Sequence, residues 1–182
     1  LLICYYHLSS GYSMSSDSKR LSNWADQLIE LNFNFYNFFL IEKSLIRPHL
    51  LLFSIPVFLI AICKVFFVNE WQFVFLLLNL TILFLSLIIF IKSLKLMGVR
   101  PILISLTIPL IVLSVDILTW PKFILTDMIY AYLVLLASFF VIKGIVKNKT
   151  YFFQLALVML LLLATRPSSF PVNFIIIFFI LI

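Results

Sequence analysis

The feature that most constrains this chain is a run of about 21 residues without charge, Trp71–Ile91, which opens with a tryptophan. A helix of that length matches the hydrocarbon thickness of a bilayer, and tryptophan is enriched where a span meets the headgroups. We expect further membrane helices in the apolar segments Pro101–Leu118, Leu125–Ile142, Tyr151–Thr165 and in the segment that begins at Val172. The sequence therefore predicts an all-α protein, a polytopic bundle of transmembrane helices.

The composition agrees with this interpretation, because 64% of the 182 residues are hydrophobic and only 11% are charged. Soluble domains average roughly 45–50% apolar and about 25% charged residues, so this chain has too few polar side chains to cover a soluble core. The chain begins inside one apolar stretch, Leu1–Leu8, and stops inside another, Phe174–Ile182. We expect a single membrane domain, residues 1–182, that is truncated at both ends.

The distribution of charge predicts which ends of the spans face the cytoplasm. The net charge of +6 lies in short segments and forms no basic patch with interleaved aromatic residues, so nucleic acid is not an expected partner. The segments Lys92–Arg100 and Lys143–Thr150 are rich in basic residues and free of acids, which predicts two cytoplasmic loops. The connections that carry Glu70, Asp127 and Arg166 then face the opposite side.

A polar segment, residues 9–48, interrupts the apolar sequence near its start and carries four of the seven acids. Within it, residues 18–31 have the apolar spacing of a helix, with one apolar and one polar face. We expect an amphipathic helix that lies in the membrane interface with its apolar side towards the lipid.

The segment His49–Val68 leaves the topology open. It is apolar, but Pro56 stands in its middle and Lys64 near its end, and both are unusual in a plain span. If it crosses the bilayer, residues 9–48 lie in the cytoplasm. If it lies along the surface as a juxtamembrane helix, they lie outside, on the side of Asp127. The charges of residues 9–48 cancel, so the charge pattern is compatible with both.

Five residues could carry chemistry, and three of them, Asp17, Asp127 and Arg166, have a structural alternative. Asp17 either caps the amphipathic helix or serves as a general base or metal ligand at the membrane surface. Asp127 opens a span and is either a cap or a functional acid. Arg166 ends a leucine-rich span and is either an interfacial anchor or a ligand for a lipid phosphate, which its planar guanidinium suits. Arg47 and His49 close the polar segment, and Arg47 offers a second cation there.

Taken in order, these motifs resemble the N-terminal part of the GT-C superfamily of integral-membrane glycosyltransferases. The branch they resemble most contains protein O-mannosyltransferases and aminoarabinose transferases. The segment Asp17–Ala25 is similar to the Asp-led external helix of that family, and Arg47–Leu50 stands in place of its Lys-Pro-Pro or His-Pro-Pro motif. Thr126–Asp127 resembles a later external Thr-Asp, and Arg166–Pro167 resembles a cation that ends a later span.

The resemblance implies that residues 9–48 form an external loop and that His49–Val68 lies along the outer surface of the membrane. Two family features are missing. Ser18 stands where the family has a second acid, and Ile46 stands where it has an acid beside the Lys-Pro-Pro motif, with Glu42 the nearest substitute. These departures leave the cofactor unknown, a divalent metal being a candidate.

By the same resemblance, the chain would move a sugar from a polyprenyl-phosphate donor to a glycan, lipid or protein acceptor on the outer side. It would be an integral multi-pass protein of a bacterial cytoplasmic (inner) membrane. Asp17 would deprotonate the acceptor hydroxyl, and Arg47 and Arg166 would hold the carrier phosphate. Asp127 and His49 would support that site, and a metal would be held by Asp17 and Asp127. Sugar and acceptor are not specified by the sequence.

Two other classes remain open. In a transporter or flippase, Asp17, Asp127 and Arg166 would line a substrate path; in a non-catalytic membrane subunit, the acids would only cap helices. Transporters of that kind tend to contain internal repeats and broken helices with polar groups at the midplane. Here no convincing repeat is found, and the charged residues cluster at the ends of spans. This distribution favours the enzyme.

Overall fold

The computed structural model describes residues 14–41, 45–46, 51–112, 114, 126–149, 151–166 and 169–181. Within these ranges the protein is helical, which confirms the all-α part of the prediction; the polytopic membrane bundle stays a prediction. The helices are α2 (Ser16–Glu30), α3 (Phe35–Phe39), α5 (Ser54–Phe66), α6 (Trp71–Leu96), α7 (Pro101–Val112), α9 (Asp127–Lys147), α10 (Phe152–Leu163) and α11 (Phe170–Leu181). The exception is a pair of antiparallel two-residue strands, β1 (Leu40–Ile41) and β2 (Leu45–Ile46).

Two of the described helices, α6 and α9, are long and apolar enough to cross a membrane. Their 26 and 21 residues correspond to about 39 Å and about 32 Å, against a hydrocarbon thickness of roughly 30 Å. Only 33% and 17% of their most apolar windows are buried inside the protein. Helices α5, α7 and α10 are apolar but shorter. The outward surfaces of α6 and α9 are therefore suited to lipid.

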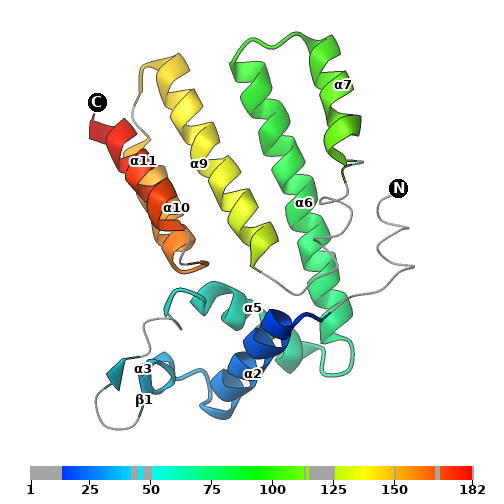
Figure 1. Cartoon of the computed structure of the whole chain (residues 1–182), viewed down its shortest axis with the longest axis vertical. Coiled ribbons are helices and arrows are strands. Elements are labelled where there is room, and N and C mark those ends of the chain that lie inside the picture. The colour runs from blue at the N-terminus through cyan, green and yellow to red at the C-terminus, as the bar shows by residue number, and fades with distance from the viewer. Residues whose placement is uncertain are drawn as a thin grey trace.

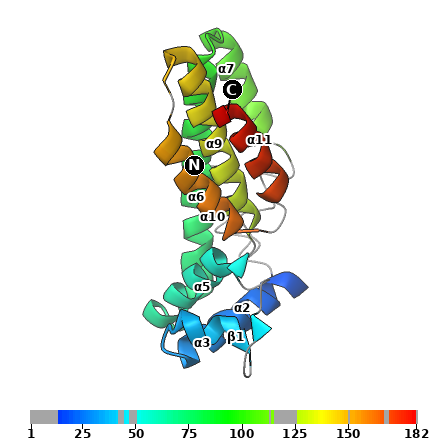
Figure 2. The ribbon, with the colours of Figure 1, turned by 90° about the vertical axis from the view of Figure 1, so that its left-hand side faces the viewer.

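The long helices α6 and α9 lie side by side, and α2, α3, α5 and β1 gather at one end of them (Figure 1). Helix α9 packs against α6 on one side and α10 on the other, and α11 contacts both α9 and α10. A second view shows the same division, with α2, α3 and α5 at one end and the other helices beyond them (Figure 2). Helix α9 begins and α10 ends near α5, whereas α6 and α9 both end at the far end.

The C-terminal ends of α6 and α9 differ from the prediction. Both helices continue five residues beyond the expected ends at Ile91 and Ile142. The first five residues of each predicted loop are therefore helical, and the prediction is wrong there. Lysine is a good helix former and its charge is favourable near a helix C-terminus, so Lys side chains do not end a helix. The helices end where Gly98 and Asn148 adopt left-handed conformations, with φ of 75° and 48°.

Helix α2 is the predicted amphipathic helix, and it begins two residues earlier than expected. Its N-cap is Ser15, whose hydroxyl accepts a hydrogen bond from the Ser18 amide at 3.1 Å while the Ser18 hydroxyl accepts one from the Ser15 amide. This reciprocal pair satisfies two amides that otherwise lack partners. The cap considered for Asp17 is therefore wrong. Asp17 lies in the first turn, where its charge suits the helix dipole.

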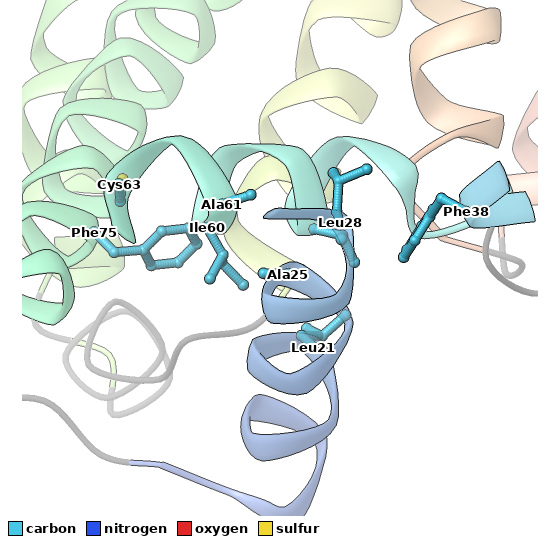
Figure 3. Close-up of a cluster of buried hydrophobic side chains, with 9 residues drawn as sticks. Leu21, Ala25, Leu28, Phe38, Ile60, Ala61, Cys63 and Phe75 are labelled. Atoms are coloured by element: carbon cyan, nitrogen blue, oxygen red, sulfur yellow. The ribbon is translucent and has the colours of Figure 1, made fainter. Parts of the chain in front are cut away.

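The apolar face of α2 is covered by α5, not by lipid as the sequence suggested. The close-up shows α2 running across α5, with Phe75 of α6 closing one side (Figure 3). The buried residues of this cluster are Leu21, Ala25, Leu28, Phe38, Val57, Ile60, Ala61, Cys63 and Phe75. Because α5 is itself apolar, the two helices remove each other's apolar surface from water or from the membrane interface.

A polar contact reinforces this packing. Lys64 of α5 donates hydrogen bonds to the Ser22 carbonyl at 3.1 Å and to Asp26 Oδ1 at 2.7 Å, both on α2. Its ammonium group also lies 4.9 Å from the ring centroid of Trp71, the first residue of α6. We call this contact the Lys64 bridge. It explains a cation that is unusual for a membrane span, because the charge is paired at the surface of the helix.

Helix α5 lies across the end of the bundle (Figure 1). The Ile55 amide donates a hydrogen bond to the Ala164 carbonyl at 3.1 Å, and Ile55 and Leu59 pack against the core formed by α9 and α10. Its 13 residues extend about 20 Å, less than the hydrocarbon thickness of roughly 30 Å. Length and direction both favour the juxtamembrane alternative for this segment.

The α2–α5 contact predicts unequal effects of two leucine substitutions. Leu28 is fully buried and Leu31 is 37% exposed, although they lie within one turn of each other. We expect Leu28→Ala to weaken the docking of α2 by about 2–5 kcal/mol, because it removes buried methyl groups and leaves a cavity. Leu31→Ala is the matched control and should cost much less. Hydrogen exchange of α2 in the full-length protein measures both, and equal acceleration would contradict the packing described.

The position of α5 also predicts a labelling pattern. Cys63 is buried and burial raises the pKa of its thiol, so it should react slowly with maleimides. With Cys4 replaced by serine, Asn23→Cys and Lys149→Cys place exposed thiols at the two ends of the protein. A membrane-impermeant maleimide should label Asn23→Cys in intact cells and Lys149→Cys only after permeabilisation. Labelling of both from one side would mean that α5 crosses the membrane.

Candidate functional site

Asp127 and Arg166, predicted separately, form an ion pair. Asp127 is the first residue of α9, and Arg166 lies three residues after the end of α10. The Arg166 guanidinium donates a hydrogen bond from Nη1 to Asp127 Oδ1 across 39 residues of sequence. Thr126 precedes α9 but makes no capping hydrogen bond through its side chain. The Asp127 carboxylate is therefore engaged by Arg166.

The pair is half-buried, with 40% of the Arg166 side chain and 31% of the Asp127 side chain exposed. Ion pairs with this access to water stabilise a fold by only about 0–1 kcal/mol. Arginine carries five N–H donors in a fixed fork, and one of them is used on Asp127. The Asp127 carboxylate thus fixes the orientation of the Arg166 guanidinium. The other N–H groups of the guanidinium can donate hydrogen bonds to an anionic ligand.

A pocket of about 420 Å³ opens beside this pair. Its lining consists of Asp127, Tyr130, Ala131, Val134, Leu135 and Arg166. The α9 members follow the spacing of one helix face and extend about 12 Å along the axis. Charged groups lie at the end of the helix and apolar side chains lie deeper. The pocket therefore suits an amphipathic molecule with an anionic head and a hydrocarbon tail.

Asp17 is not among the residues that line this pocket. Its carboxylate accepts a hydrogen bond from Arg20 Nη2 at 3.0 Å, and both side chains are more than half exposed. Helix α2 nevertheless lies at the end of the bundle where Asp127 and Arg166 meet (Figure 1). Helix α5 connects the two regions, through the Lys64 bridge on one side and the Ile55–Ala164 hydrogen bond on the other. The structure brings two of the predicted residues together and holds Asp17 at the same end.

The remaining predicted site residues, Arg47 and His49, lie outside the described part of the chain. Tyr130 was missed by the sequence analysis, although its position one turn after Asp127 was a usable signal. Among the residues that the structure describes, no three His, Cys, Asp or Glu side chains gather as a metal site would require. A divalent metal held by Asp17 and Asp127 stays a prediction.

Comparison with known proteins leaves the family open. No family model matches this chain, and neither a curated protein nor a solved structure matches it. The resemblance to GT-C glycosyltransferases therefore stays a prediction.

The exposure of the ion pair predicts a weak contribution to stability. In a double-mutant cycle of Asp127→Asn and Arg166→Gln, we expect a coupling of about 1 kcal/mol or less for the unfolding free energy. The exposed pair Asp17–Arg20, mutated to Asn and Gln, is the matched reference. Thermal unfolding of the four variants in detergent measures the coupling. A value of several kcal/mol would identify Asp127–Arg166 as a structural ion pair and not as a ligand site.

Proposed function

We propose that this chain belongs to a membrane glycosyltransferase that transfers a sugar from a polyprenyl-phosphate donor to an acceptor on the outer side of a bacterial cytoplasmic membrane. The observation that carries the proposal is the pocket beside Asp127 and Arg166, which is lined by these two charged groups and by apolar side chains further along α9. A polyprenyl phosphate has the same division, an anionic head on an isoprenoid chain. Helix α9 is one of the two candidate spans, so the chain of such a donor would reach the pocket from the bilayer.

In this proposal Arg166 binds the phosphate and stabilises it as the leaving group. The sugar-linked phosphate is a diester with one negative charge, and a second charge develops as the bond to the sugar breaks. A guanidinium beside that oxygen binds the transition state more strongly than the ground state, which is the requirement for catalysis. Asp127 would be a positioning residue, because it holds the guanidinium towards the pocket.

Asp17 would be the general base that removes the proton from the acceptor hydroxyl. It lies on the exposed face of α2 at the same end of the bundle, where an acceptor can approach from water. Arg20 bonds only Oδ1 of the carboxylate, so Oδ2 would accept the proton of the acceptor hydroxyl. Catalytic hydrogen bonds are often long in a free enzyme and shorten only in the substrate complex. The position of Asp17 outside the pocket lining is therefore compatible with this role.

The distribution of charges supports an enzyme over a transporter. On α6 and α9, the acidic and basic residues lie only in the first turn or the last two turns of each helix. A transport path for a charged substrate would need polar or ionisable groups near the middle of its spans. The pocket beside Asp127 lies at the start of α9, and in the proposed topology a lipid headgroup would meet a water-soluble acceptor there.

The proposal predicts that Arg166 controls binding of the carrier. We expect Arg166→Gln to weaken the binding of polyprenyl phosphate to the full-length protein in nanodiscs by about tenfold or more, because a charge-assisted hydrogen bond is lost. Arg166→Lys should retain part of the affinity. Arg100→Gln is the matched control, an exposed arginine at the far end of the bundle. Native mass spectrometry measures the bound lipid. Unchanged binding by Arg166→Gln would remove the phosphate role.

A second variant separates binding from catalysis. Asp17→Asn should leave the binding of polyprenyl phosphate intact and abolish transfer from a panel of polyprenyl-phosphate sugars, since the amide accepts no proton. Arg20→Gln removes the partner of Asp17 and should retain transfer. Full transfer by Asp17→Asn would contradict the role assigned to this residue.

A further inference from the structure

A second pocket, of about 310 Å³, lies at the opposite end of α6 and α9. Four lysines line it together with two apolar residues: Lys92, Lys95, Leu96, Phe139, Lys143 and Lys147. Lys92 and Lys95 are three residues apart on α6, and Lys143 and Lys147 are four residues apart on α9. Each pair therefore lies on one face of its helix, and the two faces meet at the pocket. We call this group the four-lysine pocket.

No acidic side chain in the described part of the chain pairs with the positive charge of this pocket. Within the described residues, the acids lie on α2, in the turn before α6 and at the start of α9, and the ion pairs they form all lie there. None of the four lysines forms an ion pair with another described side chain. Like charges at these spacings repel each other, so an anion in the pocket would stabilise the protein.

Helix geometry explains part of this arrangement but not all of it. Lysines near the C-terminus of a helix complement its dipole, which accounts for their position along α6 and α9. Lys143 also lies over two rings, 4.7 Å from the centroid of Tyr151 and 5.6 Å from that of Phe139. The dipole, however, does not require the lysines of both helices to face a common pocket. Their convergence points to a ligand.

We propose that the four-lysine pocket binds the phosphate headgroup of an anionic phospholipid. Ammonium groups bind phosphate as mobile point charges, and four of them around one pocket provide the charge for it. The apolar side chains of Leu96 and Phe139 would contact the start of the acyl chains. Both helices are candidate spans, so in a membrane the pocket would lie near the headgroups, where basic pockets between spans recognise anionic lipids. These features favour a lipid over a free anion.

This site is separate from the pocket of Asp127 and Arg166, and its occupancy would not depend on sugar transfer. By the positive-inside pattern it faces the cytoplasm, where the leaflet is anionic. A bound headgroup would contact α6 and α9 together and so hold their ends against each other. The expected consequence is a protein that is more stable in anionic membranes than in neutral ones.

The test compares two double variants that remove the same charge. Lys92→Gln/Lys147→Gln removes one lysine of the pocket from each helix and leaves Lys143 on its aromatic partners. Arg100→Gln/Lys149→Gln is the matched control, since both residues are exposed at the same end but do not line the pocket. The full-length protein is placed in nanodiscs of phosphatidylcholine with phosphatidylglycerol, and retained lipid is measured by native mass spectrometry. We expect retention of phosphatidylglycerol to fall about tenfold or more in the first variant and little in the second.

Three outcomes would overturn the proposal. An equal loss in both double variants would mean a diffuse attraction between the protein and the anionic surface. Displacement of phosphatidylglycerol by inorganic phosphate at low concentration would mean a free-anion site. The wild-type protein supplies a test that does not depend on any variant. If phosphatidylglycerol neither binds selectively nor raises its thermal stability over that in phosphatidylcholine alone, no lipid site exists.

Discussion

The docking of α5 is the contact on which the rest of the arrangement depends. A 13-residue helix is marginal by itself in water, so its stability must come from packing. One face of α5 is buried against α2 and α6, and its first turn is bonded to the end of α10 through Ala164. Most of the described packing of α2 is against α5, with Phe75 of α6 closing the same cluster. Helix α5 therefore holds Asp17 at the same end of the bundle as the pocket of Asp127 and Arg166, although it contributes no residue to that pocket.

The sequence predicted those features that depend on local pattern. The starts of α6 and α7 at Trp71 and Pro101 were correct, because an interfacial tryptophan and a proline at a first helical position are local signals. The helical period also located α2. The ends of α6 and α9 were predicted too early, because lysines were interpreted as loop residues. The better signals were Gly98 and Asn148, which adopt the left-handed conformation that ends a helix.

Contacts between distant segments could not be predicted in the same way. The charge pattern placed Asp127 and Arg166 on one side of the membrane, but their contact requires α9 and α10 to pack side by side. Similarly, Lys64 was only an anomaly in an apolar segment until α2 supplied Asp26 as its partner. Nothing in the spacing of 38 or 39 residues indicates such a pair. The sequence can show that a charged residue such as Lys64 needs a partner. Which residue becomes that partner depends on the tertiary packing.

The two ends of α6 and α9 differ in how their charges are balanced, and this difference favours one orientation. At one end, Arg166 and Lys64 are each paired with an acid. At the other end stand six basic residues without a described acidic partner: Lys92, Lys95, Arg100, Lys143, Lys147 and Lys149. Translocating unpaired cations is disfavoured, so the second end should stay in the cytoplasm. In the proposed function, the pocket of Asp127 and Arg166 would then open on the outer surface, where a lipid-linked sugar would meet an acceptor delivered from water.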